Sequence, residues 1–347
     1  MKLISNLLIV LFWSRSLALA ASLPTPNFDM SIYVLNAEST QVSSLKGGMR
    51  LGVMAQGEID ENSSYFGKMN IFFEEGSHSS LNNESYSKAS TFGIEEAYYQ
   101  YKPLFWLKLR AGITKLDNQY SPLFIYSPSL GLQEEIKVID FDTFELKINA
   151  NQKVISSNST VSRTGKLTEK SAQYYLNGLE LHWHSTDNFL KLRYDHFIIN
   201  DLNSTIADKA RFIGNTVTGL TESTKFVNEY NGHSLSAAVG FNSLTFYAHY
   251  MQNTKNNDIG LLEGVKYKVN ENYEFSAENY KIEGDTTLAT LVSPYYGATN
   301  RKGQHYRVSK FFGANQIDLN FVDSKAVKAS LYQDDLYIII ASFTHQF

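Results

Sequence analysis

The sequence contains no cysteine, and only 6 of its 347 residues are proline. The absence of cysteine excludes a disulfide framework and any zinc site built on thiolates. Beyond the first twenty residues, no window reaches the roughly 20 apolar residues that a membrane helix needs. If the mature chain lies in a membrane, it must therefore cross as a closed β-barrel, which also satisfies every backbone hydrogen bond.

A strong excess of charge is also missing. The net charge of -4 offers no basic surface to a polyanion, so nucleic acid is not expected as a partner. Hydrophobic residues make up 43% of the chain, which excludes a disordered protein. The 22 Tyr and 22 Phe are typical of strands and of the aromatic girdles of membrane barrels. They would equally suit a soluble β-sandwich, so composition leaves both architectures open.

The first twenty residues have the three parts of a secretory signal peptide. Lys2 gives the positive start, 7–13 form the apolar run, and Ala18-Leu19-Ala20 gives the small-x-small cleavage pattern. Arg15 interrupts the apolar stretch, which makes a permanent membrane anchor the less favoured interpretation. The sequence therefore predicts a signal peptide over 1–20 and one domain over 21–347.

Apolar and polar residues alternate along most of the mature chain, in segments of about ten residues. In segment 107–113, for example, Leu107 and Leu109 alternate with Lys108 and Arg110. Residues at every second position share one face of a strand. The pattern predicts strands with one apolar and one polar face, which fits a membrane barrel or a sandwich exposed to water.

The lengths of the polar links between these segments distinguish the two architectures. Short links are expected at 60–64, 102–103, 150–152, 185–188, 242–243, 270–272 and 313–315. Long links are expected at 41–47, 76–91, 114–134, 161–169, 201–230, 252–260, 284–302 and 326–334. Short links on one side and long links on the other are typical of outer-membrane barrels. We predict an all-β fold, a single transmembrane antiparallel barrel of about 16 strands with short periplasmic turns and long external loops. The count falls to about 14 if the weak segment at 153–162 and a neighbouring segment do not form strands.

The chain ends on Phe347, and Phe343 lies on the same face of the final segment. This segment resembles the C-terminal strand of Gram-negative outer-membrane proteins. The resemblance implies that Phe343 and Phe347 form a signal for the outer-membrane assembly machinery. It also implies contact with outer-membrane lipids and a location in the outer membrane of a Gram-negative bacterium. His345 departs from the pattern, because many members carry a larger apolar or aromatic residue there.

Segments 96–99 and 107–112 resemble the strand pair that precedes the third loop of the general trimeric porins. The resemblance implies a homotrimer whose third loop, here about 114–134, folds into the barrel. It implies a water-filled channel for passive diffusion of small hydrophilic solutes and ions, with no cofactor. The acidic Pro-Glu-Phe-Gly-Gly-Asp loop signature of the enterobacterial members is absent, which leaves the solute preference open.

The polar face supplies candidates for a pore constriction. The candidates on the wall are Arg50, Lys68, Lys108 and Arg110. Those in or beside the third loop are Asp117 and Glu134, with Glu135 next to them. Opposed charges across a narrow pore create a transverse field that filters solutes by charge. Gly52 and Gly112 are expected to clear space for Arg50 and Arg110. The alternative is that these charges only hydrate a wide pore and pair with their neighbours.

Enzyme motifs are absent from the sequence, which contains no phosphate loop, no H-E-x-x-H pair and no nucleophile elbow. His182 and His184 share one strand face, but a third metal ligand is not evident. We therefore expect neither catalysis nor a metal site. The competing functions are a secreted soluble β-sandwich that binds carbohydrate and a non-conducting outer-membrane adhesin barrel.

Overall fold

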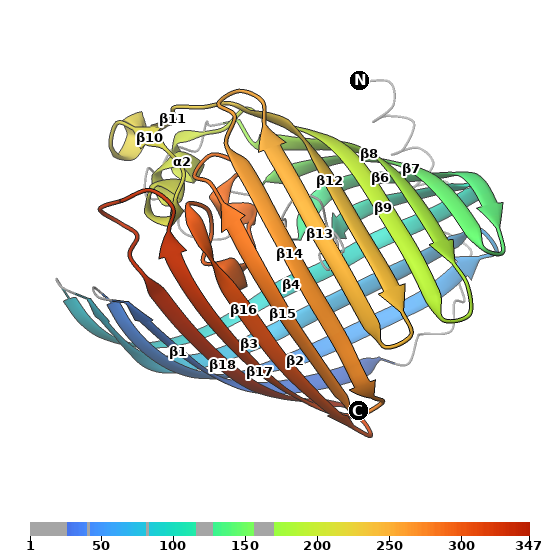
Figure 1. Cartoon of the computed structure of the whole chain (residues 1–347), viewed down its shortest axis with the longest axis horizontal. Coiled ribbons are helices and arrows are strands. Elements are labelled where there is room, and N and C mark those ends of the chain that lie inside the picture. The colour runs from blue at the N-terminus through green and yellow to red at the C-terminus, as the bar shows by residue number, and fades with distance from the viewer. Residues whose placement is uncertain (1–25, 40–41, 81–82, 116–127, 156–169) are drawn as a thin grey trace.

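The computed structural model describes residues 26–39, 42–80, 83–115, 128–155 and 170–347, so the predicted signal peptide lies outside the described residues. Sixteen antiparallel strands form one closed barrel (Figure 1). The strands of its first half are β1 (Asn27–Ser39), β2 (Val42–Asp60), β3 (Ser63–Ser80), β4 (Asn83–Leu104), β5 (Leu107–Thr114), β6 (Ser129–Phe141), β7 (Phe144–Ile155) and β8 (Ala172–His184). Those of its second half are β9 (Asn188–Asn200), β12 (Tyr230–Phe241), β13 (Leu244–Asn253), β14 (Ile259–Asn270), β15 (Tyr273–Ile282), β16 (Arg301–Phe312), β17 (Asn315–Ala326) and β18 (Leu336–Gln346). The structure confirms the count of sixteen.

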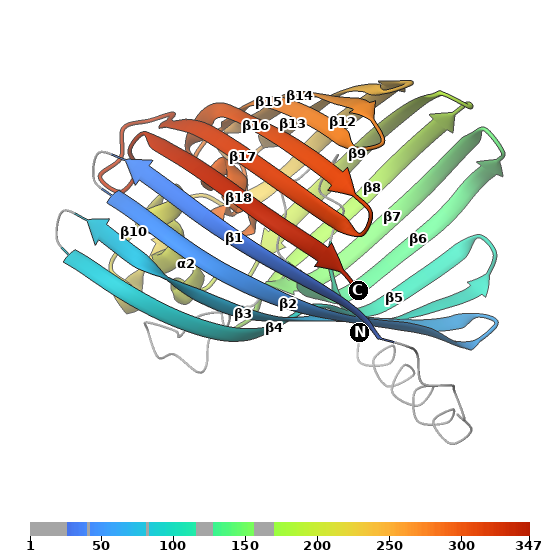
Figure 2. The same ribbon diagram turned by 90° about the horizontal axis from the view of Figure 1, so that it is seen from below.

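The first and last strands close the barrel (Figure 2). Asp29 of β1 lies opposite Gln346 of β18, and the backbone N–H of Phe347 donates to the carbonyl of Phe28 at 2.9 Å. Closure leaves no strand at the edge of a sheet, which is the condition for crossing a bilayer with strands. Within the described residues, no helix is both long and apolar enough to span a membrane.

The two faces of the strands follow the predicted parity. On β18, Ile339 is 44% exposed on the outward face, whereas its neighbour Ile338 is 8% exposed and faces the interior. The outward face of β1 to β3 is a continuous apolar belt that includes Ile32 and Phe73. Successive side chains of a strand point to opposite faces, so the alternation in the sequence maps directly onto lipid and lumen.

Two of the predicted short turns are displaced. The link expected at 150–152 lies inside β7, and the chain turns instead at Asp142-Thr143. Asn149 and Asn151 are polar because they face the barrel interior, where both are buried, and not because the chain turns there. The link expected at 102–103 lies in β4, and the turn falls at Phe105-Trp106.

Two of the predicted long links are largely strand. Most of 41–47 belongs to β2, and most of 76–91 belongs to β3 and β4. These segments are rich in Gly and Ser because the strands continue beyond the apolar belt, where the outward face no longer needs apolar side chains. Figure 1 shows the blue and teal strands β2 to β4 extending past the rest of the barrel at the end where β2 begins and β3 ends.

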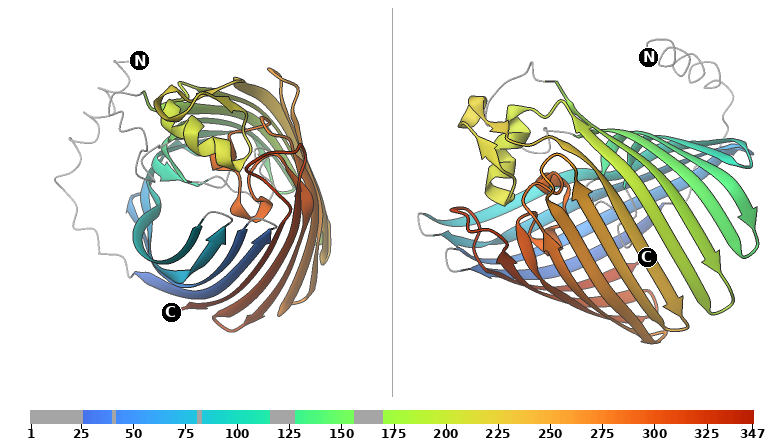
Figure 3. Two further views of the ribbon diagram at one scale, coloured as in Figure 1. Left: turned by 90° about the vertical axis from the view of Figure 1, so that its left-hand side faces the viewer. Right: turned by 45° about the horizontal axis from the view of Figure 1, so that its top comes forward.

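Two long loops at the same end of the barrel carry the helices, and we call them the mouth loops. The first, 201–229, contains α2 (Ser204–Ala210), η1 (Arg211–Ile213), β10 (Val217–Thr218), η2 (Thr221–Ser223) and β11 (Lys225–Phe226). The second, 283–300, contains η3 (Ala289–Leu291) and η4 (Pro294–Tyr296). Viewed into this end, α2 and the second mouth loop lie within the outline of the barrel (Figure 3).

Candidate pore and its lining

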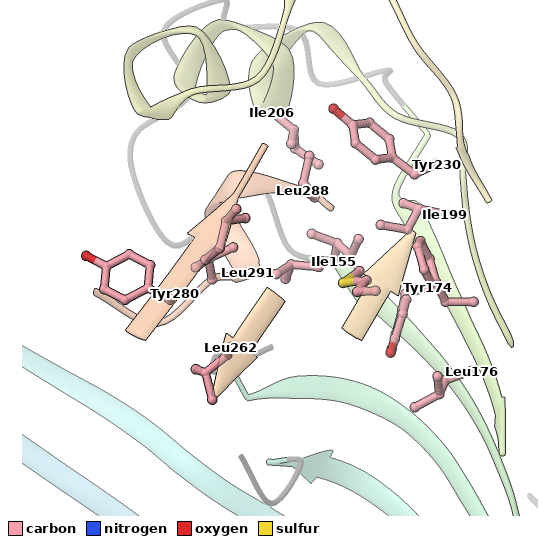
Figure 4. Close-up of a cluster of buried hydrophobic side chains, with 14 of the residues drawn as sticks. Ile155, Tyr174, Leu176, Ile199, Ile206, Tyr230, Leu262, Tyr280, Leu288 and Leu291 are labelled. Carbon is pink, nitrogen blue, oxygen red and sulfur yellow. The ribbon is translucent and has the colours of Figure 1, made fainter. Parts of the chain in front are cut away.

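The mouth loops pack against one side of the barrel wall through an apolar cluster (Figure 4). Ile206 of α2 and Leu288 and Leu291 of the second mouth loop are all buried. They join interior-facing wall residues of β8 and β15, among them Leu176 and Tyr280. Because apolar side chains leave water here, this side of the mouth is filled by protein.

Asp285 joins the two mouth loops to each other. Its side chain is buried and accepts hydrogen bonds from the backbone N–H of Thr216 at 2.9 Å, from Asn228 Nδ2 at 2.8 Å and from the Tyr230 hydroxyl at 3.0 Å. Asn215 Nδ2 adds a bond to the carbonyl of Gly284 at 2.7 Å. A buried carboxylate is stable only when its oxygens are satisfied, so these donors fix the arrangement of the loops.

Glu283 ties the second mouth loop to the barrel rim. Its carboxylate accepts from Lys281 Nζ at 2.7 Å and from the backbone N–H of Ile259 at 2.8 Å. Partial burial opposes ionisation, but these hydrogen bonds outweigh it and hold the pKa of Glu283 below its usual value. The carboxylate is therefore charged at neutral pH, and its bonds to Lys281 and Ile259 are retained there.

The sequence contains a signal for this packing in the apolar residues of the interior face. Tyr174, Leu176, Phe197 and Met251 lie on the interior face of their strands, where a water-filled barrel calls for polar residues. Apolar side chains at these positions require an apolar partner inside the barrel. The partner loops could not be read from the sequence, because their contacts join residues far apart in the chain.

The opposite side of the barrel wall carries the predicted cations. Arg50 faces the interior and donates to Asp29 Oδ1 at 2.9 Å and to Ser31 Oγ at 3.1 Å. A Cβ on Gly52 would lie 2.5 Å from the Asp29 carboxylate. Gly52 thus makes room for the partner of Arg50 and not for Arg50 itself.

Lys68 and Lys108 are also paired on the wall. Lys68 Nζ lies 3.0 Å from Glu95 Oε2, and Lys108 Nζ lies 2.6 Å from Glu135 Oε1. Both pairs join neighbouring strands and stay partly accessible to solvent. Arg50, Lys68 and Lys108 are therefore neutralised by wall carboxylates, as in the alternative in which lumen charges pair with their neighbours.

Arg110 differs from the other three predicted cations. Its Nε donates to Gln100 Oε1 at 2.9 Å, and its guanidinium lies 5.1 Å from the ring centroid of Tyr98. No described carboxylate lies within 4.0 Å of it. Gly112, two residues after Arg110, adopts φ +136°, and a Cβ there would lie 2.2 Å from the Ala97 carbonyl oxygen. This glycine therefore allows the backbones of β4 and β5 to approach closely.

Lys153 is a second interior cation without a carboxylate partner in the described ranges, and the sequence analysis did not select it. It is only 1% exposed, and its Nζ donates to Thr114 Oγ1 at 2.7 Å and to the Thr114 carbonyl at 3.0 Å. The backbone N–H of Lys115 donates to Glu96 at 3.0 Å. These bonds fix the start of the predicted third loop against the interior wall.

The predicted acidic side of the constriction is not assembled as expected. Glu134 lies opposite Leu109 and Ala150 on the outward face of the barrel, so its placement in the lumen was wrong. The neighbouring Glu135 takes the interior position and pairs with Lys108. A shift of one residue in a strand moves a side chain to the other face. Asp117 lies outside the described residues.

Ion pairs continue around the rest of the wall. Arg193 makes two hydrogen bonds to Asp195, at 2.9 and 3.0 Å, and a third to Glu180 at 3.1 Å. Arg307 pairs with Asp318 at 2.8 Å. The lumen thus carries many charges of both signs at close range, which attract water without giving the wall a strong net charge.

The remaining predicted positions lie as the parity of their strands requires. The rings of His182 and His184 have centroids 5.3 Å apart, and no group of three possible metal ligands occurs among the described residues. Phe343 lies on the outward face opposite Ile32, and Phe347 is 71% exposed at the end of the barrel. Their role as an assembly signal stays a prediction.

No family model matches the sequence, and a comparison with curated protein sequences finds no match. The fold is similar to that of Pseudomonas putida OprB, with a TM-score of 0.60 to its high-pH structure and 0.56 to its low-pH structure. The high-pH comparison has 10% sequence identity and covers 94% of each chain. Pseudomonas aeruginosa OccK7 (OpdD) gives a TM-score of 0.50 at 10% identity, over 93% of this chain and 99% of that one.

At such low identity the similarity concerns the fold alone. The closed barrel, its apolar outer belt and its charged interior are observed in this chain itself. A soluble sandwich of two open sheets is excluded by the pairing of β1 with β18. The chain is a closed barrel of sixteen antiparallel strands, a fold that it shares with Pseudomonas putida OprB.

Proposed function

We propose that this protein is a channel for passive diffusion of small hydrophilic solutes and ions across the outer membrane. The observation that supports this function most is the charged lining on the side of the barrel opposite the mouth loops. Sixteen strands enclose a lumen too wide for side chains alone to fill. The ion pairs of Arg50 and Lys68 on that lining keep 17 to 27% of their side-chain surface exposed. Hydrated charges of both signs are what a solute path through water requires.

The mouth loops narrow the entrance on one side, so we infer that solute passage follows the wall formed by β1 to β6. The similarity to porin structures is consistent with a homotrimer, and we propose that assembly. Neither catalysis nor a cofactor has a role in this function. The protein needs only a pore, and transport follows the concentration gradient.

The function is tested by solute flux into liposomes. Proteoliposomes should swell in isotonic solutions of small neutral sugars, with rates that fall steeply as the sugar grows. Heat-modifiable gel migration verifies that the barrel is folded. Folded protein that gives no swelling with the smallest sugar would indicate an adhesin or structural barrel instead.

Arg110 is expected to influence ion selectivity, because its charge has no carboxylate partner among the described residues. Replacing it in Arg110→Gln removes one positive charge from the lumen and should shift the reversal potential in a salt gradient toward cations. Arg50→Gln should act likewise by exposing the charge of Asp29. The matched control is the double variant Arg50→Gln/Asp29→Asn, which removes both charges of one pair and should leave the reversal potential unchanged. A shift in the double variant equal to that in Arg110→Gln would remove these assignments.

A further inference from the structure

Three lysines form a row on the outward surface of β15, β16 and β17. Lys281 lies directly opposite Lys302, and Lys302 lies directly opposite Lys325. Directly opposite residues of antiparallel strands project from the same face, with Cβ atoms about 5 Å apart. The face is the outward one, because Arg301 and His305, which flank it in sequence on β16, are buried on the interior side. We call Lys281, Lys302 and Lys325 the lysine row.

The charges of the lysine row are incompletely neutralised by the protein. Lys281 pairs with Glu283 at 2.7 Å. Within the part of the chain that the structure describes, Lys302 and Lys325 have no carboxylate within 4.0 Å. Asp323 lies two residues before Lys325 on the same face, and among the described residues it forms no ion pair within 4.0 Å. Like charges directly opposite each other destabilise a pair of strands, so a bound anion would remove an unfavourable contact.

The lysine row lies at the edge of the apolar belt. Toward the short turns, the next outward residues are polar and include Gln304 and Asp323. Beyond them Tyr306 and Phe321 are 42% and 39% exposed, and their rings stack with centroids 6.4 Å apart. Aromatic side chains mark the interface of a membrane barrel, and charged side chains just beyond it meet lipid headgroups.

We propose that the lysine row binds the phosphate group of a membrane lipid whose acyl chains lie along Tyr306 and Phe321. The ammonium groups of Lys302 and Lys325 supply donors on adjacent strands to one phosphate, and Lys281, whose charge is shared with Glu283, lies beside them on β15. The apolar side chains below accept the hydrocarbon. This inference rests on the outer-membrane barrel and not on conduction, so it can fail while the proposed channel function stands.

Native mass spectrometry of the detergent-solubilised protein tests this site. Phosphatidic acid should bind more tightly than phosphatidylcholine with the same acyl chains, because its headgroup carries net negative charge. Lys302→Gln should weaken phosphatidic acid binding about fivefold, and Lys302→Gln/Lys325→Gln about 30-fold. The matched control is Lys310→Gln, since Lys310 lies on β16 at the other end of the belt, beside the Tyr273 ring. It should leave the affinity unchanged.

Three results would overturn the proposal. Equal binding of the two lipids would show that the row does not recognise phosphate charge. An equal loss in Lys310→Gln would show that general electrostatic attraction is responsible. Complete competition by millimolar inorganic phosphate would show that the anion needs no lipid. All four lysines are at the surface, so heat-modifiable migration should verify that each variant is folded.

Discussion

Replacing the buried carboxylate of Asp285 is expected to release the mouth loops and widen the channel entrance. In Asp285→Ala, the donors at Thr216, Asn228 and Tyr230 lose their acceptor inside the protein. Of these donors only the Tyr230 hydroxyl is buried. A buried donor left unsatisfied costs about 1 to 3 kcal/mol, so the local stability of the loops should fall by roughly that amount. Single-channel conductance should rise about twofold, because the widened mouth conducts through a larger cross-section.

Glu229→Ala is the matched control for this substitution. Glu229 also carries a negative charge at the edge of the first mouth loop, but its side chain is 81% exposed and pairs with the exposed Lys255 at 3.2 Å. Its removal should change the conductance little. If Asp285→Ala conducts like the unaltered protein while both variants are folded, the mouth loops do not restrict the entrance.

Removing Asp195 should lower the stability of the barrel more than removing an exposed acid. Asp195 is fully buried in the wall and makes two hydrogen bonds to Arg193. Asp195→Ala leaves the guanidinium with only Glu180, and breaking such a buried pair costs about 3 kcal/mol. A Cβ at Gly178 would lie 2.0 Å from Asp195 Oδ1, so this glycine leaves the space that the buried carboxylate occupies. Urea unfolding of the refolded barrel in lipid vesicles, followed by tryptophan fluorescence, measures the difference.

The comparison for Asp195 is Glu75→Ala. Glu75 pairs with Lys88 at 3.4 Å, and both side chains are more than half exposed. An exposed pair contributes little, so the free energy of unfolding should change by less than about 0.5 kcal/mol. Equal losses in Asp195→Ala and Glu75→Ala would contradict the idea that buried wall pairs stabilise the barrel.

The strand architecture could be predicted because its signal is local. The alternation that places Ile339 outward and Ile338 inward involves only neighbouring residues. The turn at Asn242-Ser243 also has a local cause, since Asn242 adopts φ 50°, which asparagine tolerates better than most residues. The same rule failed at Asn149 and Asn151, because asparagine is favoured in turns and also occurs on the interior face of a barrel strand, where both side chains are buried. Polarity alone does not separate the two environments.

The details of the pore could be predicted only in part, because they depend on strand register. Lys108 and Arg110 follow from parity within one strand. That Lys108 pairs with Glu135, and that Glu134 faces outward, follows from how β5 and β6 align. A shift of one residue exchanges the faces, and the sequence does not specify this alignment. The mouth loops depend on contacts such as that of Asn228 with Asp285, which are far apart in the chain.

The central claim is that water and ions cross this barrel without a ligand or an energy source. It is tested most directly by recording current across a planar lipid bilayer while the folded protein inserts. We expect stepwise increases of equal size, a linear relation between current and voltage, and no requirement for any added cofactor. Protein that inserts in its heat-modifiable, folded form and carries no current above the bare bilayer would contradict the channel function.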